Sequence, residues 1–112
     1  MIKVYISPIC IDCRNLMAIL KARGIEEQFQ LINITEDILL LKEFTTLRDH
    51  NPAFADKKAD PAGSSIGIPA FVKEDGAISF DFDEAFAWIG QPPVQEEEIV
   101  EHREDSLTEQ KQ

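Results

Sequence analysis

The spacing of apolar residues changes several times along the first 90 residues, and each change predicts a different element. Residues 2–6 are rich in β-formers and predict a buried strand. Residues 12–23 carry apolar side chains at helical spacing, and Gly24 is placed to end that helix. A second strand is predicted over 29–34. It should pair in parallel with the first strand, because strand–helix–strand crossovers are right-handed.

The next stretch predicts a second helix and a long loop. Thr35 is the expected N-cap, and residues 38–48 form the helix, with more apolar side chains than one face requires. From 49 to 67 the composition turns to Asn, Pro, Gly and Ser, which predicts a loop with a short helical turn near Pro52. Because this loop leads directly into Ile68-Pro69, we expect it to be functional and to lie close to the cysteines.

Two short apolar runs, 70–73 and 77–80, flank Asp75-Gly76 and predict a β-hairpin. A last helix follows, with Asp81 or Asp83 as its N-cap and Gly90 after its end. The fold class is therefore α/β, with residues 1–90 as one domain. Residues 91–112 are acidic and poorly apolar, so we expect a disordered tail whose removal leaves stability almost unchanged.

The composition of the chain narrows the range of its possible functions and partners. The 112 residues suit a single domain, which we expect to be monomeric. A net charge of −10 disfavours nucleic acid and anionic membranes as partners, because both attract basic surfaces. No apolar run approaches the ~20 residues of a membrane span, and the first residues show no secretory signal. These features favour a cytoplasmic protein.

The chemistry is concentrated at Cys10 and Cys13, the only cysteines of the chain, between the first strand and the first helix. A helix amino terminus stabilises a thiolate, which is the attacking species in thiol–disulfide exchange. We expect Cys10 to attack and Cys13 to resolve the mixed disulfide. Inert core cysteines are one alternative. Half of a zinc site is another, but it would require His50 and His102 as further ligands.

The element order βαβαββα, with Cys10-Ile11-Asp12-Cys13 after the first strand and Ile68-Pro69 before the third, resembles the thioredoxin fold in its glutaredoxin form. The resemblance covers residues 1–90 and implies a four-stranded mixed sheet. It also implies a thiol–disulfide oxidoreductase acting on disulfides or mixed disulfides. In that family Pro69 would be cis and face the sulfurs, the backbone of Ile68 would pair with substrate, and Asp83 would contact glutathione.

Several positions depart from the usual glutaredoxin. Ser7 stands where a Lys or Arg is common, and Ser79-Phe80 replaces a Gly-Gly pair that helps to bind glutathione. We therefore expect no bound cofactor or metal and weak use of glutathione. A disulfide-containing protein or another low-molecular-weight thiol is the expected partner.

Two alternatives remain open. The stretch from Tyr5 to Arg14 also looks like the start of the Spx and arsenate-reductase family, whose Spx members are redox-sensing regulators that bind RNA polymerase. No Arg precedes Pro69, as that family would require. The other alternative is a thioredoxin-fold binding module that keeps its cysteines without turnover.

Overall fold

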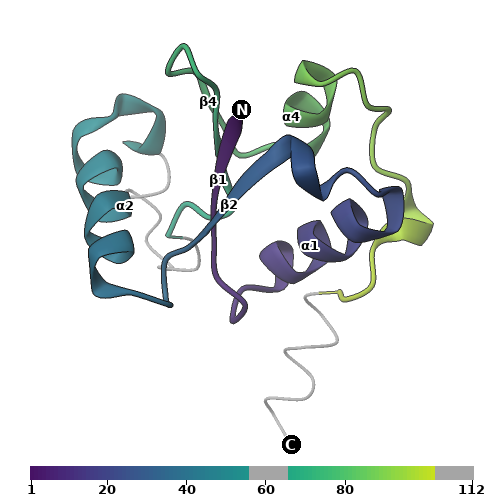
Figure 1. Ribbon diagram of the computed structural model, residues 1–112, viewed down its shortest axis with the longest axis horizontal. Helices are drawn as coiled ribbons and strands as arrows, with labels where there is room; N and C mark the ends of the chain where they lie inside the picture. The colour runs from purple at the N-terminus through teal and green to yellow at the C-terminus, as the bar shows by residue number, and fades with distance from the viewer. Residues whose placement is uncertain (56–65, 103–112) are drawn as a thin grey trace, which may run out of the picture.

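The computed structural model describes residues 1–55 and 66–102, which form a four-stranded mixed sheet with helices on both faces (Figure 1). The strand order is β2-β1-β3-β4. β1 pairs in parallel with β2, whereas β3 pairs antiparallel with β1 and β4. The predicted α/β class and the order of elements are confirmed over these ranges. The strands are β1 (Ile2–Ile6), β2 (Phe29–Asn33), β3 (Ala70–Val72) and β4 (Ile78–Ser79), and the helices are α1 (Ile11–Arg23), α2 (Ile38–His50) and α4 (Phe82–Trp88).

Alternating side chains of the central strand β1 divide the core into two halves. Val4 belongs to the half that contains residues of α1 and α4, whereas Tyr5 belongs to the half that contains Phe44 of α2. Successive side chains of a strand point to opposite faces, so one strand supplies both halves. Figure 1 shows the same division, with α1 and α4 on one side of the sheet and α2 on the other.

The helix ends follow the expected chemistry with one correction. Gly24 has a left-handed φ of 68° and caps α1 through its backbone N–H. The N-cap of α2 is Asp37, whose carboxylate accepts the N–H of Leu39 at 2.8 Å, so the prediction of Thr35 is wrong. Thr35 lies in the preceding turn, where its hydroxyl donates to Asn33 at 2.8 Å. No helix of the described ranges is long and apolar enough to cross a membrane.

The predicted hairpin is present, with shorter strands than expected. Gly76 provides the positive φ of its turn, 94°. Asp81 caps α4 by accepting the N–H of Asp83 at 3.0 Å, which decides between the two predicted caps. The predicted helical turn after α2 is a 3₁₀ turn, Pro52–Phe54. The remainder of the predicted loop, residues 56–65, lies outside the described residues.

The segment 91–102, which we call the C-terminal strap, contradicts the prediction of a disordered tail that begins after Gly90. It contains a 3₁₀ turn, Glu96–Glu98, and places Val94 and Ile99 against the core half that includes α1. Figure 1 shows the strap running beside α1. Composition misled here because apolar residues that dock singly on a preformed surface leave no periodic pattern. Residues 103–112 lie outside the described residues.

Candidate functional site

The loop that carries the cysteines is fastened at its start by Ser7. This side chain is buried, and its hydroxyl lies 3.1 Å from the hydroxyl of Thr35, at the end of β2. The N–H of Ile9 donates to the Ser7 hydroxyl at 3.4 Å, and the N–H of Cys10 donates to the Ser7 carbonyl at 3.1 Å. A position where the resemblance would place a cation is therefore filled by a small buried hydroxyl that joins two strand ends.

Cys10 is the N-cap of α1, with an extended backbone, and its sulfur accepts the N–H of Cys13 at 3.3 Å. Sulfur here takes the role that a side-chain oxygen usually has at an N-cap. The two cysteines are free thiols that come within 3.1 Å of each other. Cys10 is partly exposed, whereas Cys13 is fully buried. The two cysteines therefore differ in how far solvent and substrate can reach their sulfur atoms.

Its surroundings also make the pair unequal in acidity. The pKa of Cys10 is lowered to about 6, chiefly because the Cys13 thiol donates a hydrogen bond to the Cys10 sulfur. Burial raises this pKa, the Cys13 backbone N–H lowers it, and the charge of Asp12 raises it. Asp12 therefore opposes the thiolate, as its position between the cysteines suggests, but the hydrogen bonds outweigh its effect.

The pKa of Cys13 is raised above its ordinary value. Its hydrogen bond to Cys10 is the largest cause, because a thiol that donates to a thiolate is stabilised in its protonated form. Burial adds to this effect. At neutral pH the pair therefore holds one proton, on the buried sulfur, and one negative charge, on the accessible sulfur.

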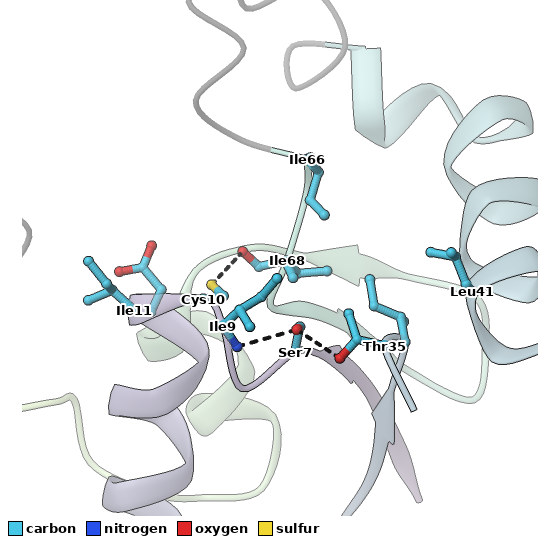
Figure 2. Close-up of a pocket in the computed structure, with 10 residues that line it drawn as sticks. Ser7, Ile9, Cys10, Ile11, Thr35, Leu41, Ile66 and Ile68 are labelled. Carbon is cyan, nitrogen blue, oxygen red and sulfur yellow. Dashed lines mark hydrogen bonds between the residues drawn. The ribbon is translucent and has the colours of Figure 1, made fainter. Parts of the chain in front are cut away.

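Ile68-Pro69 faces this charge. The Ile68–Pro69 peptide bond is cis, as the resemblance implied, and the Ile68 carbonyl oxygen lies 3.9 Å from the Cys10 sulfur (Figure 2). Gly67, just before it, has a φ of 100°. A Cβ at Gly67 would lie 2.8 Å from the ring of Phe54, so only glycine fits between that ring and the turn into Ile68.

A cavity of about 340 Å³ opens beside Cys10 (Figure 2). We call it the isoleucine pocket after the side chains that dominate its wall. Ser7, Thr35, Cys10 and Asp12 supply its polar groups. Its apolar wall consists of Ile9, Ile11, Ile34, Leu41, Ile66 and Ile68.

Asp83, the predicted glutathione contact, and Phe80, which replaces a glycine of the resemblance, both have other contacts in the structure. The carboxylate of Asp83 accepts the N–H of Val94 at 2.9 Å, so it fastens the strap, and Asp83 is not among the residues that line the isoleucine pocket. Phe80, where the resemblance would place a glycine, packs edge-on against Phe54 with 5.0 Å between ring centroids. The structure brings Cys10, Cys13 and Ile68 together but gives Asp83 a different role.

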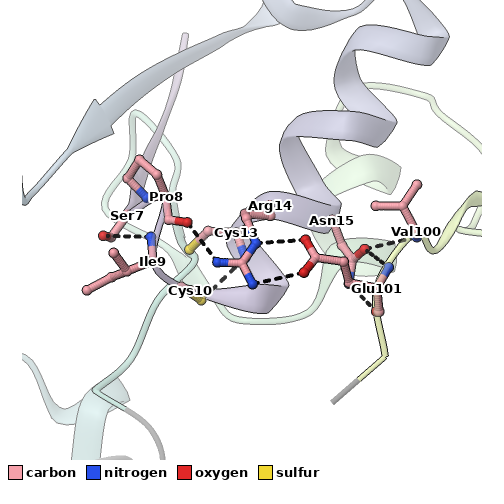
Figure 3. Close-up of polar contacts among 9 residues, drawn as sticks. All are labelled: Ser7, Pro8, Ile9, Cys10, Cys13, Arg14, Asn15, Val100 and Glu101. Atoms are coloured by element: carbon pink, nitrogen blue, oxygen red, sulfur yellow. Dashed lines mark hydrogen bonds and ion pairs between the residues drawn. The ribbon is translucent and has the colours of Figure 1, made fainter. Parts of the chain in front are cut away.

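Sequence reasoning missed the contact between the strap and the cysteine helix (Figure 3). Arg14 donates to both carboxylate oxygens of Glu101, at 2.7 and 2.9 Å, and to the Pro8 carbonyl at 2.9 Å. One guanidinium thus joins the cysteine loop to the strap. The apolar pair Ile99-Val100 was the one sequence signal for docking, and it does not identify the partner.

The histidines of the zinc alternative have other neighbours. His50 is the last residue of α2, and its Nδ1 lies 2.8 Å from the Thr46 carbonyl oxygen. The Nε2 of His102 lies 4.0 Å from a carboxylate oxygen of Glu96. Among residues 1–55 and 66–102, no group of three or more His, Cys, Asp and Glu side chains is arranged to hold a metal ion.

Comparison with known proteins adds no relative: no family model, curated protein or solved structure matches the chain. The functional conclusion therefore rests on the geometry of the site. That geometry provides an accessible thiolate, a second thiol within reach, and an apolar pocket beside them.

Proposed function

We propose that this chain is a thiol–disulfide oxidoreductase with a thioredoxin fold in its short, glutaredoxin-like form. The support for the fold is the strand order β2-β1-β3-β4, the two helix layers, and a cis proline opposite a cysteine pair. Reversible dithiol chemistry needs one accessible nucleophile and one sheltered partner close to it.

The observation that carries the proposal is the inequality of the two cysteines. Cys10 is partly exposed and has a pKa lowered to about 6, whereas Cys13 is fully buried and has a raised pKa. At neutral pH only the Cys10 sulfur is both ionised and accessible. A reactive cysteine is expected to be partly exposed and to have a lowered pKa, as Cys10 does, whereas an inert structural cysteine is expected to be buried.

In the first step, the Cys10 thiolate attacks one sulfur of a substrate disulfide. A new S–S bond joins Cys10 to that sulfur, the original S–S bond breaks, and the other substrate sulfur leaves as a thiolate that takes a proton from solvent. No net oxidation of the protein–substrate pair occurs in this step. The product is a mixed disulfide at Cys10.

The mixed disulfide prepares Cys13 for the second step. Once Cys10 is bonded to substrate, it carries no negative charge, so the largest cause of the raised Cys13 pKa is removed. Cys13 then loses its proton to solvent and attacks the Cys10 sulfur. The mixed disulfide breaks and the second substrate thiolate leaves. The substrate has gained two electrons and the protein holds a Cys10–Cys13 disulfide, which an external thiol or dithiol must reduce.

Trapping of the mixed disulfide tests this order. Cys13→Ser keeps a hydroxyl donor beside Cys10 and should accumulate mixed disulfides when disulfide substrate is added. Cys10→Ser is the matched variant and should accumulate none. Accumulation in Cys10→Ser alone would contradict the proposed order of attack. A reversible Cys10–Cys13 disulfide with no turnover of any substrate would favour the redox-sensing regulator.

A further inference from the structure

We propose that the isoleucine pocket receives a large apolar side chain that flanks the reactive cysteine of a protein disulfide. The inference rests on the proposed function and names its substrate class. A volume of about 340 Å³ lies at the lower end of the range for ligand pockets. It suits one large side chain rather than an extended cofactor.

Two of the polar side chains that line the pocket are already hydrogen-bonded within the protein. The hydroxyls of Ser7 and Thr35 lie 3.1 Å apart, and both have further partners within the protein, Ile9 N–H and Asn33. Six of the lining side chains are aliphatic. A group that enters this pocket therefore gains mainly by removing apolar surface from water.

Charge disfavours an anionic thiol. Asp12 is the one charged residue among the described residues that line the pocket, and it is acidic. The whole chain has a net charge of −10. Glutathione is anionic at neutral pH, so Asp12 and the net charge of the chain oppose its approach.

Exposed apolar side chains outside the pocket favour a protein over a small thiol. Ile9 and Ile66, which border the pocket, are 80% and 49% exposed. Ile38 and Leu39, in the first turn of α2, are 73% and 69% exposed. Because β1 and β2 are parallel, α1 and α2 begin at the same edge of the sheet, so Ile38 and Leu39 lie at the edge where the helix that begins after Cys10 also starts. A small thiol would use only the pocket, whereas a protein chain can cover this whole edge.

The test uses mixed disulfides that differ in one feature. Short peptides with a single cysteine, flanked on both sides by Leu, Asn or Asp, are each joined to thionitrobenzoate. Attack of the Cys10 thiolate on the peptide sulfur breaks the S–S bond and releases the coloured thionitrobenzoate anion. We expect the Leu peptide to react about tenfold faster than the Asn peptide, which has a similar size. The Asp peptide and the glutathione conjugate should be slower still.

Substitutions of pocket residues test whether the pocket causes the preference for the Leu peptide. Leu41→Ala and, separately, Ile9→Ala should reduce the advantage of the Leu peptide over the Asn peptide. Leu31→Ala, a partly exposed position on β2 outside the pocket, is the matched control and should leave the ratio unchanged. Because Ile9 is mostly exposed, its truncation should not impair folding.

The controls separate the two proposals. A hydroxyethyl–thionitrobenzoate disulfide reports Cys10 attack without any flanking side chain, and a butyl conjugate reports a small apolar thiol. Equal rates for all peptides, with the hydroxyethyl conjugate reactive, would overturn the pocket assignment and leave the proposed function intact. A butyl conjugate as fast as the Leu peptide would overturn the choice of a protein substrate. Failure of every conjugate to react would refute the proposed function itself.

Discussion

The side chain of Asn15 and the backbone of Glu101 are hydrogen-bonded in both directions. The Asn15 amide group donates to the Glu101 carbonyl at 2.8 Å, and its oxygen accepts the Glu101 N–H at 2.9 Å. The same oxygen accepts the Val100 N–H at 3.0 Å. Asn15 is only 4% exposed. Its side chain therefore pairs with the strap backbone away from water, much as a neighbouring strand would. The strap is therefore part of the folded domain, beside the helix that begins at Cys10.

Removal of the strap should destabilise the domain. A chain that ends at Gly90 loses the contacts of Val94 and Ile99 with the core and leaves the polar groups of Asn15 without these partners. We expect the free energy of unfolding to fall by about 2–4 kcal/mol. Chemical denaturation measures this change. A chain that ends at His102 is the matched control and should be as stable as the full chain. Equal stability of both truncated chains would show that the strap is not docked in solution.

Acid should weaken the attachment of the strap through Glu98. Arg23 donates to both Glu98 carboxylate oxygens, at 2.8 and 2.7 Å, and these hydrogen bonds, with one from Gln95, lower the Glu98 pKa to about 2. An unfolded glutamate titrates near ~4.3. The contribution is therefore complete above that pH and is lost as the pH falls toward 2.

Comparison with Glu98→Gln isolates this contribution. The variant should be less stable than the native chain at neutral pH, and the difference should close between about pH 4.3 and 2. Glu97→Gln changes an exposed residue of the same 3₁₀ turn and should keep the native pH profile. A Glu98→Gln difference that is independent of pH would argue against the ion pair.

Gly67 should tolerate substitution much less than Gly76. Both residues have positive φ, 100° and 94°, so alanine is strained at either position. Only at Gly67 would the added Cβ meet a ring, that of Phe54, which is fully buried. We expect Gly67→Ala to cost about 1–3 kcal/mol more than Gly76→Ala, as overpacking does. Thermal or denaturant unfolding of the two variants gives the difference, and equal losses would contradict the predicted clash.

The sequence supports the fold well where the signals are local. Gly24 ends α1 as predicted, and Asp75-Gly76 marks the hairpin, because each signal depends on the backbone of a few adjacent residues. The prediction that Cys10 and Cys13 lie between the first strand and the first helix is also confirmed, since Cys10 caps α1 and Cys13 lies in its first turn. The N-cap of α2 was wrongly predicted as Thr35, because Thr35 and Asp37 are both good N-cap residues and only the backbone conformation selects Asp37.

The contacts of the strap could not be predicted because they are long-range pairings of ordinary surface residues. Arg14 with Glu101, and Arg23 with Glu98, join positions far apart in the chain with no shared spacing. The acidic composition describes the charge of the strap correctly. It does not identify the two arginines that form ion pairs with its glutamates. The inequality of Cys10 and Cys13 likewise depends on burial and on a hydrogen bond between them.

The pH dependence of alkylation at each cysteine tests the central claim most directly. Reduced protein is exposed briefly to iodoacetamide across a pH series, and mass spectrometry locates the modified residue. We predict modification of Cys10 with a midpoint near pH 6 and almost none of Cys13. Cys13→Ala should move the Cys10 midpoint upward, because it removes the hydrogen bond that is the largest cause of the lowered pKa. Equal modification of both cysteines, or a Cys10 midpoint near the ~8.5 of an ordinary thiol, would contradict the account.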